Sequence, residues 1–408
     1  MPVSSITYSI PYLLYLLVLV GLAFVEMRRL KYELDTRYIR WTVILSFLVF
    51  FGLRGFVFTD WIIYYRLFDI MPTLWDGGLE TLQTVTEVFE ADIEVGAAGY
   101  EMGFILSTFL FKSLIPNYFV WVFVNTLVDI WLLDLFIRRY SPYYVLSFVV
   151  FVAMGGLIIE CNLMRNVKAI LLFMVSLKYI EERRLLPYLA LNLLGAMFHS
   201  SAIIFIPLYF FLHKTLPRWL LWTVFVVGNV IFLLKISYLQ PLLVGLADVL
   251  GGRLGVQIKI YFALDMYNQP YGISLGYIER VATFLLLILL HKPLVALNNR
   301  NNLIINCYVI YFILFFFFSE VMIAVERLTL LFVFSYWVLY PLMYQLIKDT
   351  VIKWVSMIIL VLFCSAKTIT TSSSIFSRYD NLLIGIQDAE TRKMIHDNNV
   401  DEFLKGRE

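Results

Sequence analysis

Long apolar runs alternate with short polar segments over most of the chain. A run of about 17–25 apolar residues can cross a bilayer as a helix, whereas a shorter run is more often re-entrant or interfacial. Candidate runs cover residues 10–25, 41–57, 102–115, 118–137, 143–159, 167–180, 185–198, 200–212, 219–236, 275–290, 303–319, 321–347 and 351–365. This pattern predicts an all-α, polytopic helical membrane protein with about 12 (10–14) transmembrane helices and with re-entrant or amphipathic segments at its outer face.

The composition supports the same class. Of the 408 residues, 61% are hydrophobic and only 15% are charged, and the mean hydropathy is +0.82. A soluble domain has about 25% charged residues, so a soluble protein of this composition would expose a large apolar surface. Intrinsic disorder requires low hydrophobicity and high charge, which excludes that class. The net charge of +2 gives no electrostatic reason to expect nucleic acid as a partner.

Lysine and arginine in short loops predict the orientation. The polar segment after the first run is expected to be cytoplasmic because it holds Arg28, Arg29, Lys31, Arg37 and Arg40. The segment 58–101 carries nine acidic residues against the single Arg66, as expected for an outer loop. We interpret the run 102–115 as re-entrant or interfacial, because another span there would move the later basic loops outside. Both termini are then expected outside the cytoplasm.

No linker or internal repeat divides the chain. We therefore expect one polytopic membrane domain over residues 1–366 and a polar C-terminal tail over 367–408. Outer-face loops with short helices are expected at 58–117 and 237–274, where the patterns of 79–95 and 237–250 are typical of surface helices. An equally good interpretation is that these two helices only cover loops.

Cysteine and histidine give no sign of metal or redox chemistry. Cys161, Cys307 and Cys364 all lie in apolar runs, and the four histidines, at 199, 213, 291 and 396, have no paired spacing. Neither set matches a disulfide framework or a metal-binding motif. We therefore expect no metal and no cofactor.

Several arginines fall near the predicted outer ends of the apolar runs. Arg54 lies within the outer end of the second run. Arg165, Arg280 and Arg327 lie near the starts of later runs, and Arg66 and Arg253 lie in polar segments. An arginine at membrane depth is costly and usually functional, and its guanidinium suits bidentate binding of phosphate, which helix N-termini also favour. A lipid diphosphate at the outer leaflet is the expected partner. The alternative is that each arginine reaches the headgroups or pairs with a neighbouring acid such as Glu279 or Glu326.

Four further titratable residues are candidates for chemistry. His199 lies between two short apolar runs and could act as a base or a donor, or simply pack or cap a helix. Asp60 could be a base or the partner of the nearby arginine. Asp134 precedes Arg138 by four residues, which favours a structural ion pair on one helix. Asp129 has no evident partner in the sequence and would suit a proton-coupled transporter.

The same positions carry a resemblance to a known family. The matching pieces are Gly52-Leu53-Arg54 with Thr59-Asp60 and Tyr64 or Tyr65, Tyr100-Glu101 with Gly103-Phe104, Asn162 with Arg165-Asn166, Phe198-His199-Ser200-Ser201-Ala202, and Glu326-Arg327. In order and spacing, over about residues 50 to 345, they resemble the EpsG-type branch of the Wzy-like bacterial polysaccharide polymerases. Three positions depart from the family's usual residues, which are glycine at Phe58, proline at Met102 and glutamine at Asn166.

The resemblance implies an inverting, metal-independent glycosyltransferase at the outer face of the bacterial cytoplasmic membrane. The implied donor is a growing glycan on undecaprenyl diphosphate, and the acceptor is a lipid-linked repeat unit; membrane lipids surround the chain, and a chain-length regulator protein is a further implied partner. Arginines would stabilise the charge on the departing pyrophosphate, and a base would activate the acceptor hydroxyl. The expected catalytic residues are His199, Asp60, Arg54 and Arg165, and the expected binding residues are Arg327, Arg280, Arg253, Tyr64, Tyr65 and Glu101.

Two other classes remain open. A membrane O-acyltransferase that modifies surface glycans would also be polytopic, but its histidine should face inward or lie at mid-membrane, whereas His199 is predicted near the outer face. A flippase or transporter for lipid-linked oligosaccharides would need polar residues along a path through the membrane. Apart from Asp129 and Asn125, the charged and polar candidates cluster at one face, which favours the polymerase.

Overall fold

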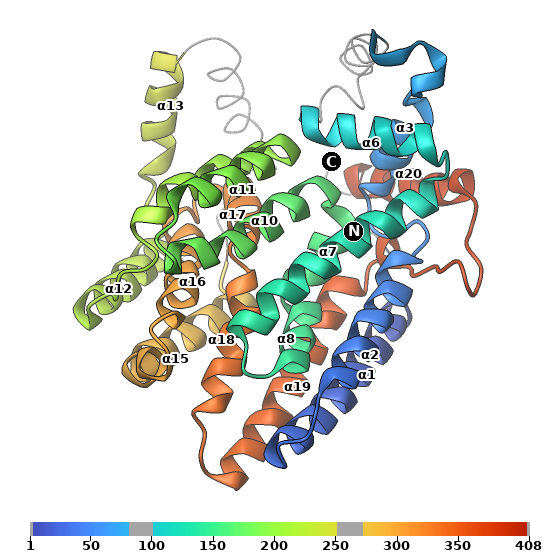
Figure 1. Ribbon diagram of the computed structural model, residues 1–408. Coiled ribbons are helices and arrows are strands. Elements are labelled where there is room, and N and C mark those ends of the chain that lie inside the picture. Colours follow the sequence, from blue (N-terminus) through green and yellow to red (C-terminus); the bar gives the residue numbers. More distant parts are fainter. Residues whose placement is uncertain (1–2, 81–100, 251–271, 406–408) are drawn as a thin grey trace. The chain divides into compact units, whose positions relative to one another are not determined.

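The computed structural model describes residues 3–80, 101–250 and 272–405. Over these residues the chain is helical, and its only β contacts are three isolated bridges, so the all-α prediction is confirmed. The chain forms two compact units, one of residues 1–209 with 347–408 and one of residues 210–346. We refer to them as unit 1 and unit 2 (Figure 1).

Unit 1 contains four helices that are long and apolar enough to cross a membrane. They are α1 (Ile6–Lys31), α7 (Tyr118–Tyr140), the bent helix Tyr144–Asn162 that comprises α8, η4 and α9, and α19 (Thr350–Ser372). Polar side chains start three of them: Ser5 accepts from Thr7 N, Asn117 from Val120 N and Asp349 from Ile352 N. Such N-caps satisfy amide groups that have no partner within the helix.

The remaining helices of unit 1 are shorter or less apolar. They are α2 (Arg37–Phe47) with the π-turn η1 (Leu48–Gly52), α3 (Trp61–Ile70), α6 (Met102–Leu114), α10 (Met164–Glu181), α11 (Leu185–Phe198) and α20 (Ala389–Lys405), with short 3₁₀ turns η2 (Leu74–Asp76), η3 (Gly78–Glu80), η5 (Ser200–Phe210) and η6 (Ile375–Ser377). α10 packs against α7 and α11 and is buried along most of its length.

Unit 2 is built around α16 (Asn301–Phe317), which packs on α12 (Arg218–Leu234), α15 (Leu275–Leu297), α17 (Met322–Leu330) and α18 (Phe334–Gln345). α15 is long and apolar enough to span a membrane, and α12 together with α13 (Leu239–Leu250) forms a pair bent by 89° that passes the same test. The helix expected at 237–250 is therefore present as α13. The helix expected at 79–95 lies almost entirely outside the described residues.

By length and composition, five helices of the described residues can span a membrane, or six if the bent pair is one span. The expected count of about 12 is not confirmed. Part of the difference is that several runs form broken or short helices: run 41–57 leaves α-geometry at η1, and the apolar helices α11 and α16 have only 10–17 residues. Hydropathy alone does not separate a lipid-facing span from a helix buried within the protein. One membrane domain over residues 1–366 stays a prediction.

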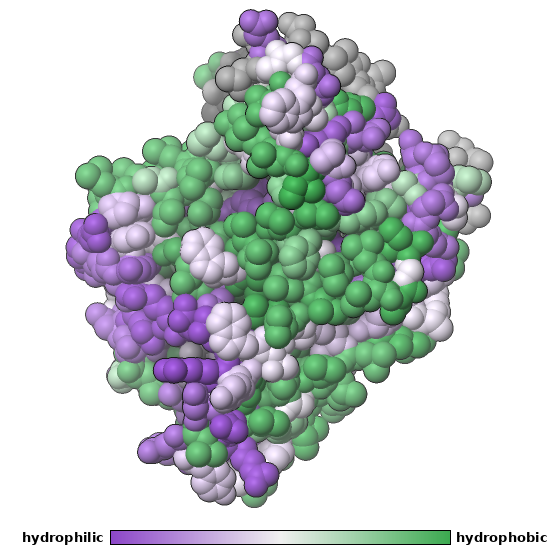
Figure 2. All heavy atoms as spheres, turned by 45° about the vertical axis from the view of Figure 1, so that its right-hand side comes forward, coloured by the Kyte–Doolittle hydropathy of each residue, from purple (hydrophilic) through white to green (hydrophobic). Residues whose placement is uncertain are grey.

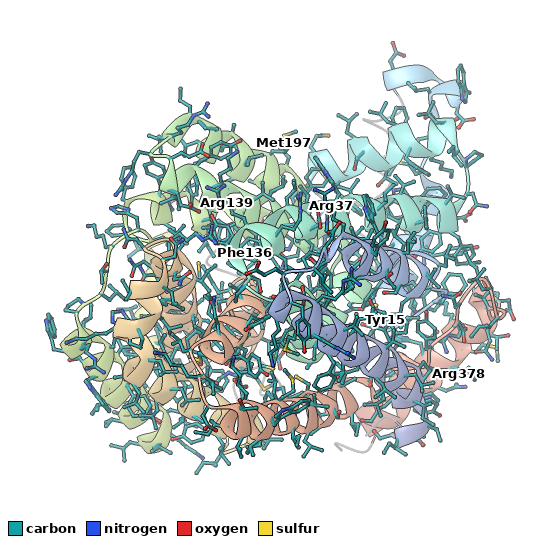
Figure 3. All side chains as sticks on the ribbon, turned by 60° about the horizontal axis from the view of Figure 1, so that its bottom comes forward. Tyr15, Arg37, Phe136, Arg139, Met197 and Arg378 are labelled. Carbon is teal, nitrogen blue, oxygen red and sulfur yellow. The ribbon has the colours of Figure 1, made fainter. Side chains whose placement is uncertain are left out.

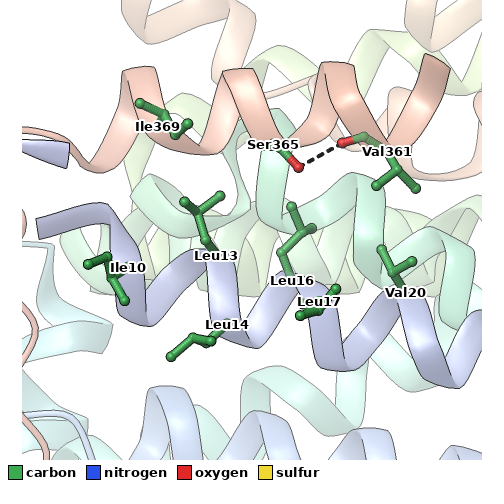
Figure 4. A pocket seen from close by; sticks show the side chains of 9 residues that line it. All are labelled: Ile10, Leu13, Leu14, Leu16, Leu17, Val20, Val361, Ser365 and Ile369. Atoms are coloured by element: carbon green, nitrogen blue, oxygen red, sulfur yellow. Dashed lines mark hydrogen bonds between the residues drawn. The ribbon is translucent and has the colours of Figure 1, made fainter. Parts of the chain in front are cut away.

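α1 packs against α8 and α19, and an apolar groove lies between α1 and α19. The groove, of about 340 Å³, is lined by α1 side chains from Ile10 to Val20 and by Val361, Ser365 and Ile369 of α19 (Figure 4). The Ser365 hydroxyl donates to Val361 O at 2.8 Å, so the lining has little polar character. Figure 2 shows a broad apolar surface with hydrophilic side chains gathered at its margins, as a bilayer requires.

Ion pairs and backbone contacts identify the two ends of unit 1. At one end Asp134 accepts from Arg40 at 2.7 Å and from Arg138 at 3.0 Å, so the predicted Asp134–Arg138 pair is confirmed. At the same end Arg139, beside Phe136 on α7 (Figure 3), pairs with Glu181 at 3.0 Å. The other end holds the start of α1 and the residues after α19, because Ser5 N donates to Ser373 O at 2.8 Å.

Candidate functional site

Polar residues from five helix ends meet at the end of unit 1 that holds the start of α1. The helix ends are the starts of α3, α6 and α10 and the ends of α9 and α11. We call this group the polar cluster; it consists of Thr59, Asp60, Tyr64, Glu101, Asn162, Arg165, Asn166, His199, Ser200 and Ser201. All of these residues lie in the motifs that carry the family resemblance, and the structure brings them together although the motifs are distant in sequence.

Asn162 holds the turn that presents Asp60. Its Oδ1 accepts from Thr59 N at 3.0 Å and from Asp60 N at 2.8 Å. The Thr59 hydroxyl donates to Asp60 Oδ1 at 3.0 Å. Phe58, directly before this turn, has φ 66°, in the left-handed region that costs a residue with a Cβ about 1–2 kcal/mol. This is the position at which the resemblance expects glycine.

Glu101 joins three elements of the polar cluster. Its Oε2 accepts from Arg165 Nη1 at 3.1 Å, and its Oε1 accepts from the backbone N–H of Ser200 at 2.8 Å. The Arg165 side chain is 15% exposed, so this is a partly buried, charge-assisted interaction. The start of α6, the start of α10 and the residue after His199 are therefore held at one point.

α6 reaches this point because Gly103 permits it. A Cβ at Gly103 would lie 2.6 Å from the carbonyl oxygen of Met197, a residue of α11 that Figure 3 labels. No side chain could occupy that space without moving one helix. The glycine of the Tyr-Glu-x-Gly-Phe motif therefore allows the close helix contact that brings Glu101 to Ser200 and Arg165.

His199 is oriented by the residues that follow it and by α10. Its Nδ1 lies 2.7 Å from the Ser201 hydroxyl, which lies 3.3 Å from Asn166 Oδ1. When Ser201 donates to Asn166, its oxygen accepts from His199 Nδ1–H, and Nε2 carries the basic lone pair. When Ser201 donates to Nδ1, Nε2 carries the proton and His199 is a donor. The tautomer therefore decides which role the imidazole has.

Tyr64 and Tyr65 lie on α3 but have different surroundings. Tyr64 is buried beside both Asp60 and Arg165; burial, reinforced by the charge of Asp60, raises its pKa to about 12. Its hydroxyl therefore keeps its proton at neutral pH. Tyr65 is half-buried and packs edge-on against Phe56 and Tyr118. Of the two, Tyr64 belongs to the polar cluster.

Arg54 lies deeper than the polar cluster, inside the helix packing. Its side chain is 5% exposed, and it donates to Phe51 O at 2.6 Å, Thr126 Oγ1 at 3.1 Å and Glu160 O at 3.0 Å. Its nearest acid is Glu160, at 3.9 Å, rather than Asp60. The guanidinium therefore ties the end of η1 to α7 and α9, and its candidate role is to hold the loop that leads to Asp60.

A second buried pair lies beside Arg54. Lys168 of α10 donates to Asp129 of α7 at 2.5 Å, and both side chains are less than a tenth exposed. No partner for Asp129 is evident from the sequence, and Lys168 and Glu160 were not among the predicted site residues. The available signal was one acidic and one basic residue within two strongly apolar runs, Asp129 in 118–137 and Lys168 in 167–180, since buried charges are almost always paired. Asp129 thus has a structural partner within unit 1.

Three of the predicted binding arginines lie outside unit 1. Arg280 of α15 lies over the ring of Phe315 at 4.0 Å, donates to Gly276 O at 2.7 Å and pairs with Glu279 at 3.7 Å. Arg327 lies on α17 with an exposed side chain. Arg253 lies outside the described residues. The prediction that Arg280, Arg327 and Arg253 bind the substrate stays a prediction.

The polar cluster can serve three chemical purposes. Arg165 and the starts of α3, α6 and α10 favour an anion, because the helix dipole makes an N-terminus positive. His199 and Asp60 are candidate bases. The Tyr64 hydroxyl can donate a hydrogen bond. Within the described residues, no group of three or more His, Cys, Asp or Glu side chains could hold a metal ion.

Comparison with known proteins agrees with the motifs. No curated protein and no solved structure matches the chain. The model of the EpsG family matches residues 37–381, a range that includes every residue of the polar cluster. Because this match covers most of the chain, the chain belongs to the EpsG family.

Proposed function

We propose that this protein is a polysaccharide polymerase that transfers a growing glycan from undecaprenyl diphosphate to a lipid-linked repeat unit. Family membership supports a membrane glycosyltransferase of the polymerase type. The observation that carries the proposal is the convergence of one guanidinium, one imidazole and one carboxylate, those of Arg165, His199 and Asp60, at one end of a bundle of apolar helices. A lipid-linked substrate would bring its headgroup to such an end while its tail stays in the bilayer.

The proposed roles follow from the geometry. Arg165 binds the pyrophosphate and stabilises the negative charge that develops as the glycosidic bond to phosphate breaks. Glu101 fixes one nitrogen of Arg165 and so sets the direction of the guanidinium plane. His199 takes the proton of the acceptor hydroxyl, with Asp60 as the other candidate. Arg54 supports the loop that carries Asp60.

The finer features of the reaction belong to the same proposal. Attack of the acceptor on the face opposite the pyrophosphate inverts the anomeric carbon, and the arginine supplies positive charge without a metal. The polar cluster faces the periplasm or the cell exterior from the bacterial cytoplasmic membrane, since the acidic segment 58–101 contains Asp60 and the basic segment 28–40 lies at the opposite end of α1. The polymer is an exopolysaccharide, capsule or O-antigen chain, and a chain-length regulator is a further proposed partner.

The structure weakens one argument for a transporter. Asp129 supported that class because it had no evident partner, and its partner is Lys168 at 2.5 Å. A paired, buried acid is sufficiently explained by helix packing. Among the described residues, only His199 itself supports an O-acyltransferase. That class is therefore an outcome of the test below.

The test is elongation of purified lipid-linked repeat units by the protein in nanodiscs. We expect a ladder of lipid-linked products from wild type and from Arg184→Ala, which removes an exposed arginine near the opposite end of α10. Arg165→Ala should give single repeat units only. Transfer of acyl groups without elongation would instead identify an acyltransferase, and a substrate moved across the bilayer unchanged would identify a transporter.

A further inference from the structure

The residues after α19 return to the loop that leads into the polar cluster. We call residues 374–392 the C-terminal segment; it packs along residues 53–58, the loop that leads from η1 to Thr59 and Asp60. Three backbone hydrogen bonds join the two: Leu382 N to Leu53 O at 2.9 Å, Gly55 N to Asp380 O at 2.9 Å and Phe58 N to Phe376 O at 2.8 Å. The sequence pattern had suggested only a polar tail here.

Side chains of the C-terminal segment also complete the end of η1. The π-turn leaves carbonyl groups without helical partners. Asn381 Nδ2 donates to Val49 O at 2.8 Å, and the Tyr379 hydroxyl donates to Phe50 O at 2.8 Å. The segment therefore takes the place of the next helical turn for the residues just before the loop.

The contact is close enough to require glycine in the loop. A Cβ at Gly55 would lie 2.8 Å from Ile386 Cγ2 and 2.9 Å from Asp380 Cβ. Such distances are shorter than packed carbon atoms normally allow. The loop and the C-terminal segment are therefore in direct backbone contact.

Arg392, in the first turn of α20, anchors the contact from the other side. Its side chain is 4% exposed, and both Nε, at 3.1 Å, and Nη2 donate to Phe56 O. Nη2 also donates to Arg378 O at 2.7 Å, and Asp380 lies 3.9 Å from Nε. One guanidinium thus binds the loop carbonyl and two groups of the C-terminal segment.

The loop ends at Phe58, whose backbone conformation is unfavourable for a residue with a Cβ. Phe58 has φ 66°, and its amide donates to Phe376 O. On its other side Asn162 binds the amides of Thr59 and Asp60. The left-handed residue is therefore held between the C-terminal segment and the polar cluster, as expected where structure over-determines an unfavourable conformation near a functional site.

We infer that the C-terminal segment is a positioning element and that Arg392 is its positioning residue. The segment holds Phe58 in its left-handed conformation and thereby orients Thr59 and Asp60 toward the other residues of the polar cluster. The effect on turnover rests on the proposed polymerase function, whereas the effect on the loop does not. Arg392 lies beyond residues 37–381 that match the family, so the match assigns it no role.

The first experiment measures hydrogen exchange of peptides covering residues 53–60 in nanodiscs. Arg392→Gln removes the bonds to Phe56 O and should speed exchange of the Gly55 and Phe58 amides by about tenfold or more. Lys393→Gln is the matched control, because it removes the neighbouring charge on the same helix. Equal exchange in the two variants would overturn the inference, and this arm needs no enzymatic activity.

The second experiment uses the backbone preference of glycine. Arg392→Gln should lower turnover at saturating lipid-linked substrate by about tenfold. Adding Phe58→Gly should restore most of it, because glycine adopts positive φ without a steric penalty; adding Phe58→Ala, which also removes the ring, should not. If Arg392→Gln does not accumulate, Arg392→Lys replaces it in both experiments. Equal turnover in the glycine and alanine double variants would overturn the inference, whereas a wild type without elongation would refute the proposed function alone.

Discussion

Glu101 and Arg165 form an ion pair of 3.1 Å across 64 residues of sequence, joining the start of α6 to the start of α10. The second oxygen of Glu101 binds the amide that follows His199. A single carboxylate thus orders the arginine proposed to bind pyrophosphate and the turn that carries the candidate base. Substitution of either residue should therefore change the position of the other and lower activity.

Arg165→Ala should lower the elongation rate by about 10²–10³, the loss typical of removing one donor that stabilises transition-state charge. Arg165→Lys should recover little, because an ammonium keeps the charge but lacks the planar fork that can bind Glu101 and a phosphate together. Rates are measured on purified lipid-linked repeat units, with protein level as a control. Full activity of the lysine variant would show that a general positive field is sufficient.

His199→Gln and Asp60→Asn should separate the two candidate bases. If the His199 imidazole is the base, acidification should lower wild-type activity, because protonation removes the lone pair. His199→Gln should then fold but not turn over. The measurement is elongation from about pH 5.5 to 8 by wild type and both variants. A nearly normal His199→Gln beside an inactive, folded Asp60→Asn would assign the base to Asp60.

Arg54→Ala should lower the amount of folded protein as well as its activity. The substitution leaves Glu160 buried without its nearest cation and three hydrogen-bond acceptors without their donor, a loss of about 3–5 kcal/mol for a buried pair. Thermal unfolding in detergent, read by size-exclusion chromatography, measures it against Arg165→Ala, which should unfold near the wild-type temperature. An Arg54→Ala protein of normal stability but no activity would return Arg54 to the catalytic residues.

Gly103→Ala should break the contacts of Glu101 within the polar cluster. A methyl group there meets the Met197 carbonyl oxygen at 2.6 Å, so α6 or α11 must move and Glu101 is drawn away from Ser200 and Arg165. We expect activity to fall at least about tenfold. Gly21→Ala is the control: it also lies within a helix, nothing lies within 4 Å of its Cβ position, and alanine favours helix by up to about 1 kcal/mol. Similar activity of both variants would contradict the packing role of Gly103.

Cysteines introduced at Asp35 and Glu390 test the orientation. Both positions are exposed, at opposite ends of unit 1, and the native Cys161, Cys307 and Cys364 are buried. An impermeant thiol reagent should label position 390 but not 35 in intact cells, because the basic segment near residue 35 is expected in the cytoplasm. Labelling of 35 alone would reverse the topology and move the polar cluster to the cytoplasmic side.

The structural class and one local ion pair could be predicted from the sequence alone. Apolar runs and few charges identify a helical membrane protein, since a bilayer leaves little choice of backbone. The Asp134–Arg138 pair follows from its spacing of four residues, which places both side chains on one helix face. The motifs around Asp60, Glu101, Arg165 and His199 indicated the family, which the match over residues 37–381 confirms.

Only the tertiary structure decided what each of these residues contacts. Arg54 looked like a ligand for phosphate, and packing against Glu160 and Thr126 made it part of the helix framework. Lys168 reaches Asp129, and Arg392 reaches Phe56 O across 336 residues. Helix periodicity relates residues three or four apart, but it carries no information about which distant segments pack together. Those contacts depend on shape, on glycines such as Gly55 and Gly103, and on hydrogen-bond partners for the buried polar groups.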